Sequence, residues 1–415
     1  MKIKLLSRIK PNLGYKELVA FLTSKSDSVE RFEEKFAEKF NAKSALAFSY
    51  GRYAQFSFFK ALGISKTEVI MPAYTCSVVA HAVTLSDNIP IFVDIDQNSF
   101  NMNLHKLRDT ITENTSAIIC TNTFGNPENN KIIHKLIEEA EKKYGRKIYF
   151  IQDCCHSFGA TTDNQLINMN CDVAVYAFNV SKIITTIFGG MLIFNDEKIG
   201  ETVRKWRDKH TKSKTFTQKI KLVLYLWATY VAFKPLCYRI IYLLQNRTKL
   251  LDHFTKAYHL DNKIHFPPDA NTRMSNLQAE IGSIQLLKYD ELIMLRRSNA
   301  KKYQSYLKKY DFVKTVEFNV GATYSHYPVT VPENIKLKIM EKAAHEGIEF
   351  GELIQYSIPK LPEYRDHCRV SYPNSEFCSK TTLNLPLLSP HIEIDVFPKL
   401  DVIFEYNYGV STNAT

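Results

Sequence analysis

Seven short, apolar, β-rich segments between residues 45 and 195 constrain the fold of this chain more than any other feature. They are ALAF (45–48), EVIM (68–71), IPIFVDI (89–95), SAIICT (116–121), KIYFIQD (147–153), DVAVYAF (172–178) and GGMLIFN (189–195). The stretches between the first five include segments with helical periodicity, such as NKIIHKLIEEAEKKYG (130–145), which ends at a glycine as helices often do. Apolar strands alternating with helices are typical of a mostly parallel sheet with helices on both faces. The sequence therefore predicts an α/β fold with a ligand site beyond the carboxyl ends of the strands.

The length of 415 residues fits one large domain plus a smaller one. We expect residues 1–200 to form an N-terminal segment and the large domain. Residues 201–265 would form a basic, apolar helical insert, and residues 266–415 a long helix and a small α+β domain. The eight cysteines have neither disulfide-framework nor zinc-site spacing, so no metal is expected. The basic N-terminus has no sustained apolar run, and the simplest interpretation is a reducing cytoplasm without a secretory signal.

The positive charge is concentrated in one segment. Residues 201–250 carry twelve lysines and arginines against two acidic residues, a net charge of +10 out of +11 for the whole chain. A general nucleic-acid-binding protein would spread basic residues over a reading face, so the sequence predicts no nucleic-acid partner.

The same segment is apolar and aromatic between residues 221 and 244, where Lys234 and Pro235 interrupt it. The simplest interpretation is a helical hairpin that packs on the protein or on a second copy, with solvated lysines. A second interpretation is peripheral contact of residues 205–246 with an anionic membrane at its inner face. The Lys-Pro pair disfavours a true membrane span.

Lys182 is the one charge in an uncharged run, AFNVSKIITTIFGG (177–190). A buried lysine costs several kcal/mol unless it is paired or neutralised, for example as an imine with a carbonyl cofactor. Other polar groups at the predicted carboxyl edge of the sheet are Asp153, His156, Gly51 and Arg52, the last two at a helix start. Each signal is weak alone, because a strand-end aspartate is more often a turn residue and a lone lysine is usually solvated. Together, a carboxylate, an amine and a helix-start anion site suit pyridoxal 5′-phosphate (PLP).

The sequence also resembles the DegT/StrS sugar aminotransferases, which are fold-type-I PLP enzymes. The resemblance covers nearly the whole chain except about residues 205–265, and its blocks follow the family's order. They include VERFEEKFAEKFNAKSALAFSYGR, ALGISKTEVIMPAYTCSVVAHAV, IPIFVDIDQNSFNMN, TNTFGNPENN, IQDCCHSFGA, AFNVSK, NTRMSNLQAEIGSIQLLKYDEL and LNLPLLSP.

The resemblance implies a role for each candidate site residue. Lys182 is the lysine that binds the cofactor covalently and moves the proton, and Asp153 pairs with the pyridine nitrogen. Five further residues contact the cofactor: His156 near the ring hydroxyl, Gly51, Arg52 and Tyr53 on the phosphate turn, and Ser181 before the lysine. Asn271 reaches the phosphate of a partner subunit, which implies a homodimer with shared active sites, and Arg273 in the same loop is assigned to the substrate.

Two positions depart from the family's pattern. Ala177 stands where the family often has serine, and Cys76 stands where an aromatic residue commonly stacks on the cofactor ring. Arg52 would compensate for the missing phosphate hydroxyl with a charge-assisted contact.

The resemblance implies transfer of an amino group, with glutamate as donor, to a nucleotide-linked keto-sugar for a bacterial surface polysaccharide. One alternative is a PLP-dependent dehydratase or lyase; some family members of that kind replace the lysine by histidine, and this chain keeps Lys182. A second alternative is a non-catalytic member that acts as a binding protein.

Overall fold

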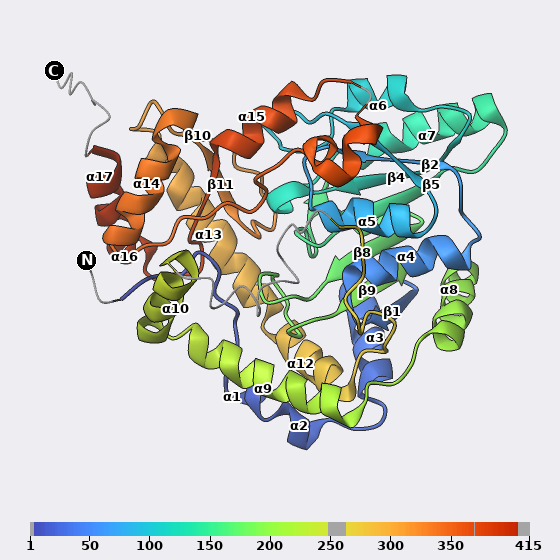
Figure 1. The fold of residues 1–415 in the computed structure, drawn as a ribbon, viewed down its shortest axis with the longest axis horizontal. Helices are drawn as coiled ribbons and strands as arrows, with labels where there is room; N and C mark the ends of the chain where they lie inside the picture. Colours follow the sequence, from blue (N-terminus) through green and yellow to red (C-terminus); the bar gives the residue numbers. More distant parts are fainter. Residues whose placement is uncertain (1–3, 248–262, 369, 406–415) are drawn as a thin grey trace.

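The computed structural model of the chain describes residues 4–247, 263–368 and 370–405 (Figure 1). The polar C-terminal tail and part of the predicted insert lie outside these residues. So do the side chains of residues 245–247.

A seven-stranded sheet forms the centre of the large domain, in the order β1-β9-β8-β5-β4-β2-β3. Its strands are β1 (Ser44–Phe48), β2 (Glu68–Pro72), β3 (Ile89–Val93), β4 (Thr115–Thr121), β5 (Tyr149–Asp153), β8 (Val173–Ala177) and β9 (Gly190–Phe194). β9 pairs antiparallel with both β1 and β8, and the pairs among β3, β2, β4, β5 and β8 are parallel. The predicted mostly parallel sheet of seven strands is therefore confirmed, with each strand within about two residues of its predicted bounds.

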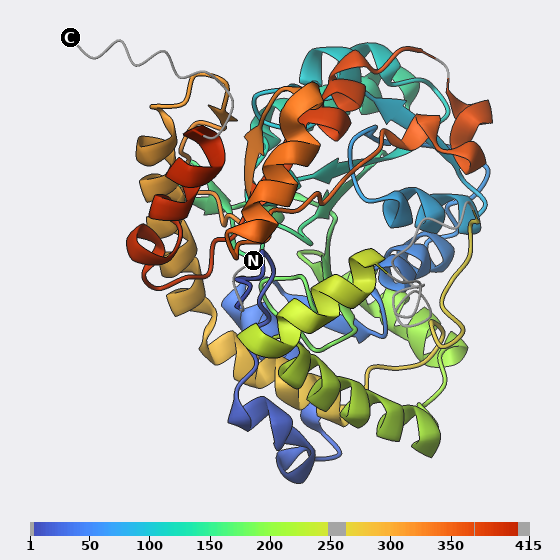
Figure 2. The same cartoon turned by 60° about the vertical axis from the view of Figure 1, so that its left-hand side comes forward.

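Helices cover both faces of this sheet, and each face has its own apolar core (Figures 1 and 2). One face carries α3 (Ser28–Lys39), α6 (Leu104–Thr110), α7 (Asn130–Tyr144) and α12 (Asn276–Leu287), and the other carries α4 (Gly51–Ala61), α5 (Ser77–Leu85) and α8 (Glu197–His210). The strands are buried on both faces, which explains their continuous apolar sequences. α7 ends at Gly145, whose φ of 65° is left-handed and terminates the helix as the sequence predicts.

A smaller α+β unit follows the long helix α13 (Tyr289–Leu307). It contains the antiparallel sheet β10 (Lys314–Thr315), β11 (Tyr327–Thr330) and β12 (Thr382–Leu385), with helices α14 (Glu333–His345), α15 (Pro373–Thr381), α16 (Ile392–Asp395) and α17 (Phe397–Glu405). Other short elements include α1 (Tyr15–Leu18), α2 (Ala20–Thr23), and the hairpin strands β6 (Thr161–Thr162) and β7 (Gln165–Leu166). The predicted small domain thus has the expected α+β character, and the predicted domain boundaries stay a proposal.

Two helices, α9 (Phe216–Ala232) and α10 (Pro235–Arg247), extend from the large domain to the small one. Thr215 and Gln218 cap the start of α9 reciprocally, and Pro235 opens α10 at a position where its missing N–H costs nothing. Among the described residues, no single helix is long and apolar enough to cross a membrane. Phe216–Ala232 and Pro235–Leu244 pass that test of length and composition only as a pair, which is bent by 102°.

Candidate active site

The carboxyl edge of the large sheet brings together the residues singled out in the sequence. β5 ends at Asp153, and β8 ends five residues before Lys182. At the same edge β1 leads into α4, which begins at Gly51. Phe48 at the end of β1 pairs with Gly190 at the start of β9, so these residues also lie at this edge. This arrangement follows from the parallel order of β1, β5 and β8.

Asp153 is a buried carboxylate with few protein partners. The Cys155 backbone N–H donates to its Oδ1 at 3.0 Å, and the Thr121 hydroxyl lies 3.4 Å from its Oδ2. In the described part of the chain, no cation forms an ion pair with this carboxylate. A buried carboxylate is costly without a cationic or hydrogen-bonding partner, so this side chain is suited to a ligand that brings a donor.

Lys182 is partly buried and stands in a tight turn after β8. Its backbone N–H donates to the Asn179 carbonyl at 3.0 Å, and the Ser181 hydroxyl donates to the Asn179 side chain at 2.7 Å. Ser181 therefore shapes the turn that presents the lysine. Within the described residues, the Lys182 amine has neither a hydrogen bond nor an ion pair.

The charges of Lys182 and Asp153 act on the same thiol. Burial raises the pKa of Cys155 well above its usual value, Asp153 raises this pKa further, and Lys182 lowers it. The carboxylate and the amine that are predicted to hold one cofactor therefore both act electrostatically on Cys155.

Two buried histidines lie close to each other, and the charge of Lys182 acts on both. The ring centroids of His156 and His326 are 5.7 Å apart, and burial together with the charge of Lys182 holds the pKa of both rings well below the ordinary value. Within the described residues, His156 Nδ1 and His326 Nε2 have no hydrogen-bond partner although both atoms are buried. Buried polar atoms normally have partners, so these two nitrogens indicate a place for a polar ligand.

Gly51 forms a narrow backbone cradle at the start of α4. A Cβ on Gly51 would lie 2.8 Å from the Ala177 Cβ, and a Cβ on Gly190 would lie 2.5 Å from the Gly51 nitrogen. Both positions therefore require glycine, and Ala177 packs directly against the turn. The Arg52 guanidinium makes no ion pair or hydrogen bond to the described residues, whereas Tyr53 is buried against Phe266. Gly51 and Arg52 are thus the parts of this turn that suit an anion.

Cys76 caps the amino end of α5 next to a tyrosine from the small domain. The Ser77 backbone N–H donates to the Tyr356 hydroxyl at 3.0 Å. Burial raises the pKa of Tyr356, and the neighbouring Cys76 raises it further. An aromatic side chain is therefore present beside Cys76, although the sequence offers none at that position.

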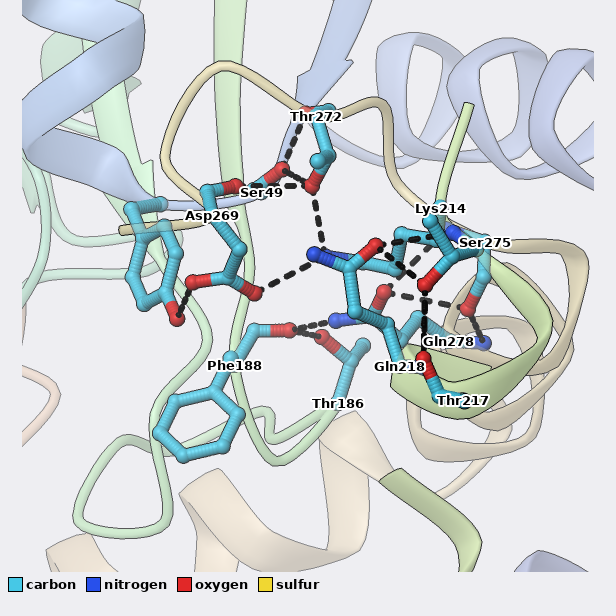
Figure 3. A network of polar contacts seen from close by, with 12 residues as sticks. Ser49, Thr186, Phe188, Lys214, Thr217, Gln218, Asp269, Thr272, Ser275 and Gln278 are labelled. Atoms are coloured by element: carbon cyan, nitrogen blue, oxygen red, sulfur yellow. Dashed lines mark hydrogen bonds and ion pairs between the residues drawn. The ribbon is translucent and has the colours of Figure 1, made fainter. Parts of the chain in front are cut away.

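A polar network connects the 269–273 loop to the sheet edge and to the segment before α9 (Figure 3). The Lys214 amine lies 3.3 Å from Asp269 and 2.7 Å from the Thr272 hydroxyl, and Ser49 also binds Thr272. Burial lowers the pKa of Lys214, and Asp269 opposes that shift. The network fixes the loop that carries Asn271.

Asn271 and Arg273 flank the buried Thr272 and are exposed on the single chain. The Asn271 carbonyl accepts from the Lys212 backbone N–H at 2.9 Å, so the backbone is fixed while the side chain is accessible. Arg273 pairs with Asp208 at the end of α8, with 3.5 Å between the charged groups. No contact joins Arg273 to Lys182 or Asp153 among the described residues, and its assignment to the substrate stays a prediction.

A sequence model of the DegT/DnrJ/EryC1/StrS aminotransferase family matches residues 18–395. The chain belongs to this family. Membership confirms the resemblance and the fold class, and it places the chain among PLP-dependent sugar aminotransferases.

Three known proteins illustrate the kinship of this family member. A GDP-perosamine synthase of Escherichia coli O157:H7 is 32% identical over 180 residues, 43% of this chain and 48% of that protein. The aminotransferase PseC of Helicobacter pylori, involved in pseudaminic acid biosynthesis, superposes with a TM-score of 0.76 at 18% identity, over 97% of this chain and 100% of that one. The E. coli GDP-4-keto-6-deoxy-D-mannose-3-dehydratase with bound hydrated PLP has a TM-score of 0.74 at 21% identity, over 97% and 99%.

The site fits the cofactor of the DegT/DnrJ/EryC1/StrS family. Within the part of the chain that the structure describes, the site has a lysine amine and two buried ring nitrogens without polar partners. It also has a buried carboxylate and a glycine cradle with no room for a Cβ. An aldehyde, a pyridine nitrogen, a ring hydroxyl and a phosphate need those kinds of partner.

Sequence reasoning did not find His326, Tyr356 or Lys214. His326 comes immediately before β11, in YSHYPVT, where an isolated histidine before an alternating strand gives only a weak signal. Tyr356 and Lys214 lie in segments without a motif.

Proposed function

We propose that this protein transfers an amino group from an amino acid, glutamate, to a nucleotide-linked keto-sugar in the cytoplasm. The product would be an amino sugar for a bacterial surface polysaccharide. The nucleotide-sugar chemistry named for the GDP-perosamine synthase supports the acceptor, and the family description supports amino transfer.

The observation that carries this proposal concerns Lys182, which follows β8 while Asp153 ends the neighbouring strand β5. The Lys182 amine has no polar partner among the described residues, and its charge acts on His156. PLP would supply an aldehyde for amine exchange and a ring that accepts electrons. Lys182 would hold the aldehyde and later move a proton at the substrate carbon. Asp153 would keep the pyridine nitrogen protonated, because its carboxylate is buried and forms no ion pair with a cation of the described residues.

Five other residues would position or border the cofactor. His156 would donate or accept at the ring hydroxyl through its partnerless Nδ1. Gly51 and Arg52 would bind the phosphate at the start of α4, where backbone N–H groups and the helix dipole favour an anion. Cys76 and the adjacent Tyr356 would border the site on the α5 side. These assignments rest on the positions of side chains that lack hydrogen-bond partners among the described residues, and on the family pattern.

A sugar dehydratase is the second candidate, because the dehydratase from E. coli shares the fold over almost the whole chain. The retained Lys182 favours amino transfer instead, because amine exchange needs a lysine that can bind the aldehyde and shuttle the proton.

Product mass distinguishes the two reactions. The purified protein, PLP and glutamate labelled with ¹⁵N are incubated with a panel of GDP-, UDP- and dTDP-linked keto-sugars. We expect a sugar nucleotide that has gained one labelled nitrogen, and 2-oxoglutarate in equal amount. A product that has lost water without gaining nitrogen would establish the dehydratase instead, and a panel without turnover by protein that binds PLP would favour the non-catalytic alternative.

We also propose a homodimer in which Asn271 of each subunit completes the site of the other. The side chain of Asn271 is exposed while its backbone is fixed by Lys212 and by the Lys214–Asp269–Thr272 network. A fixed loop with an outward polar side chain suits contact with a phosphate on a neighbouring chain.

Mixing two weakened variants tests the shared site. Lys182→Ala and Asn271→Ala should each lower activity, and subunits exchanged at equal concentration should recover about a quarter of the wild-type rate, because half of the dimers then hold one intact site. Each variant alone, treated identically, is the control. If tagged heterodimers form and activity does not recover, Asn271 does not serve the partner's site.

A further inference from the structure

Helix α9 is apolar on two opposite sides, and only one of them is covered. Leu222 and Leu226 are buried against a cluster that includes Ile187, Leu277 and Ile281. The outer side presents a stripe of five large apolar residues at helical spacing, each between 43% and 76% exposed: Phe216, Ile220, Leu224, Trp227 and Val231. A surface helix of a globular protein normally carries polar residues on its outer side, so this stripe indicates a partner surface.

Helix α10 extends the apolar stripe beyond the bend. Leu236 and Ile240 are 54% and 61% exposed and lie one turn apart. An apolar hollow of about 520 Å³ between the two helices is lined by residues that include Trp227, Val231 and Ile240. The seven exposed apolar residues of α9 and α10 and this hollow are called the hairpin surface.

The charges that the hairpin segment itself carries, from residue 209 to 251, have one sign. Lys209, Lys212, Lys219, Lys221 and Lys234 are all exposed, and the sequence has no acidic residue between positions 209 and 251. The other two described cations of this segment are engaged, because Lys214 pairs with Asp269 and Arg239 donates to the Ala344 carbonyl. The surface is therefore apolar with a basic rim.

The basic rim decides between the possible partners. A second copy packed symmetrically on this surface would bring the same five lysines of each chain together, and like charges disfavour that contact. A membrane-crossing arrangement conflicts with the 102° bend and with Lys234 in the break between the helices. An anionic bilayer fits both the apolar stripe and the basic rim. The apolar residues would enter the boundary of the acyl chains, while the lysines would contact the anionic headgroups.

We propose that the hairpin surface lies in the plane of an anionic membrane and holds the enzyme there as a peripheral protein. Trp227 is placed to sit at the level of the headgroups, as amphipathic aromatic residues do at membrane interfaces. Lys234, which lies 4.0 Å above the Tyr230 ring, would keep its charge at the boundary.

Both helices of the hairpin contact residues outside the candidate active site that are linked to it. On α9, Tyr225 packs on Phe188, six residues after Lys182, with ring centroids 5.1 Å apart. On α10, Tyr238 donates to Glu349, which in turn pairs with Arg8. The positive charge of Arg8 contributes to the low pKa of His326, after burial and the charge of His156.

Vesicle sedimentation tests the proposal with the full-length protein. We expect binding to phosphatidylcholine vesicles that contain about one third phosphatidylglycerol, and little binding to phosphatidylcholine alone. The variants Leu224→Ser/Trp227→Ser and Lys219→Glu/Lys221→Glu should each weaken partitioning by about tenfold or more. Trp227→Phe should keep the binding and lose most of the blue shift in tryptophan emission that the anionic vesicles cause.

Matched controls lie on other exposed helices. Leu287→Ser/Leu337→Ser and Lys142→Glu/Lys143→Glu change equally exposed residue types and should bind vesicles like the wild type. Circular dichroism confirms that each variant is folded. Absence of binding to anionic vesicles, or binding that neither hairpin variant changes, would overturn the proposal. So would a hairpin variant that converts a dimer into monomers in light scattering, because the surface would then belong to a second copy.

Discussion

Replacing Lys182 by alanine is expected to lower the rate constant of amino transfer by about 10⁴-fold or more. The variant loses the amine that holds the aldehyde and the group that moves the proton at the substrate carbon, so two contributions disappear together. Lys214 is not expected to take over this role, because Asp269 and Thr272 engage its amine. The fold should persist, because the Lys182 side chain makes no hydrogen bond or ion pair with the described residues.

Two measurements separate loss of the covalent link from loss of the fold. The wild type with PLP should absorb near the edge of the visible range, and borohydride reduction should fix the cofactor's mass on the peptide that contains Lys182. Both signals should vanish in the alanine variant. Lys60→Ala removes an exposed lysine at the end of α4 and should change neither. A reduced adduct on another lysine in the wild type would contradict the assignment.

Replacing Asp153 by asparagine is expected to lower the rate constant by about 10²- to 10⁴-fold. Asparagine is nearly isosteric and can still accept from the Cys155 backbone N–H, so the end of β5 should keep its shape. The change removes the negative charge that would stabilise a protonated pyridine nitrogen, and the ring then withdraws electrons less well.

For Asp153→Asn, the measurements distinguish binding of the cofactor from the rate of amino transfer. We expect the lysine-linked absorbance to form, while single-turnover transfer from glutamate becomes slow and the pH dependence of the cofactor spectrum changes. Asp311→Asn alters an exposed carboxylate and should leave both unchanged. An asparagine variant with wild-type turnover and an unchanged pH profile would show that Asp153 does not face the ring nitrogen.

The local sequence predicts most of the strands and helices of the large domain. The seven strands are recognisable because each is buried on both faces, so their apolar runs are continuous, and the helix 130–144 is marked by its period and its terminal glycine. The antiparallel direction of β9 is not readable in the same way, because strand direction depends on how the chain turns between Ala177 and Gly190.

The candidate site was only partly predictable for a related reason. Asp153, Lys182 and Gly51 stand at strand ends, where topology determines that they meet. His326 comes from the other unit of the fold, 170 residues beyond His156, and its approach depends on tertiary packing alone. Lys214 lies within the region of about residues 205–265 that lacks the family resemblance, and it pairs with Asp269 just beyond that region. No sequence motif therefore predicts this ion pair.

The position of the hairpin surface on one side of each chain has a geometric consequence for a dimer. Two such surfaces can touch a flat bilayer together only if the twofold axis stands along the bilayer normal. Engagement would then be bivalent, and avidity would make residence time on vesicles far longer for a dimer than for a single chain with the same surface.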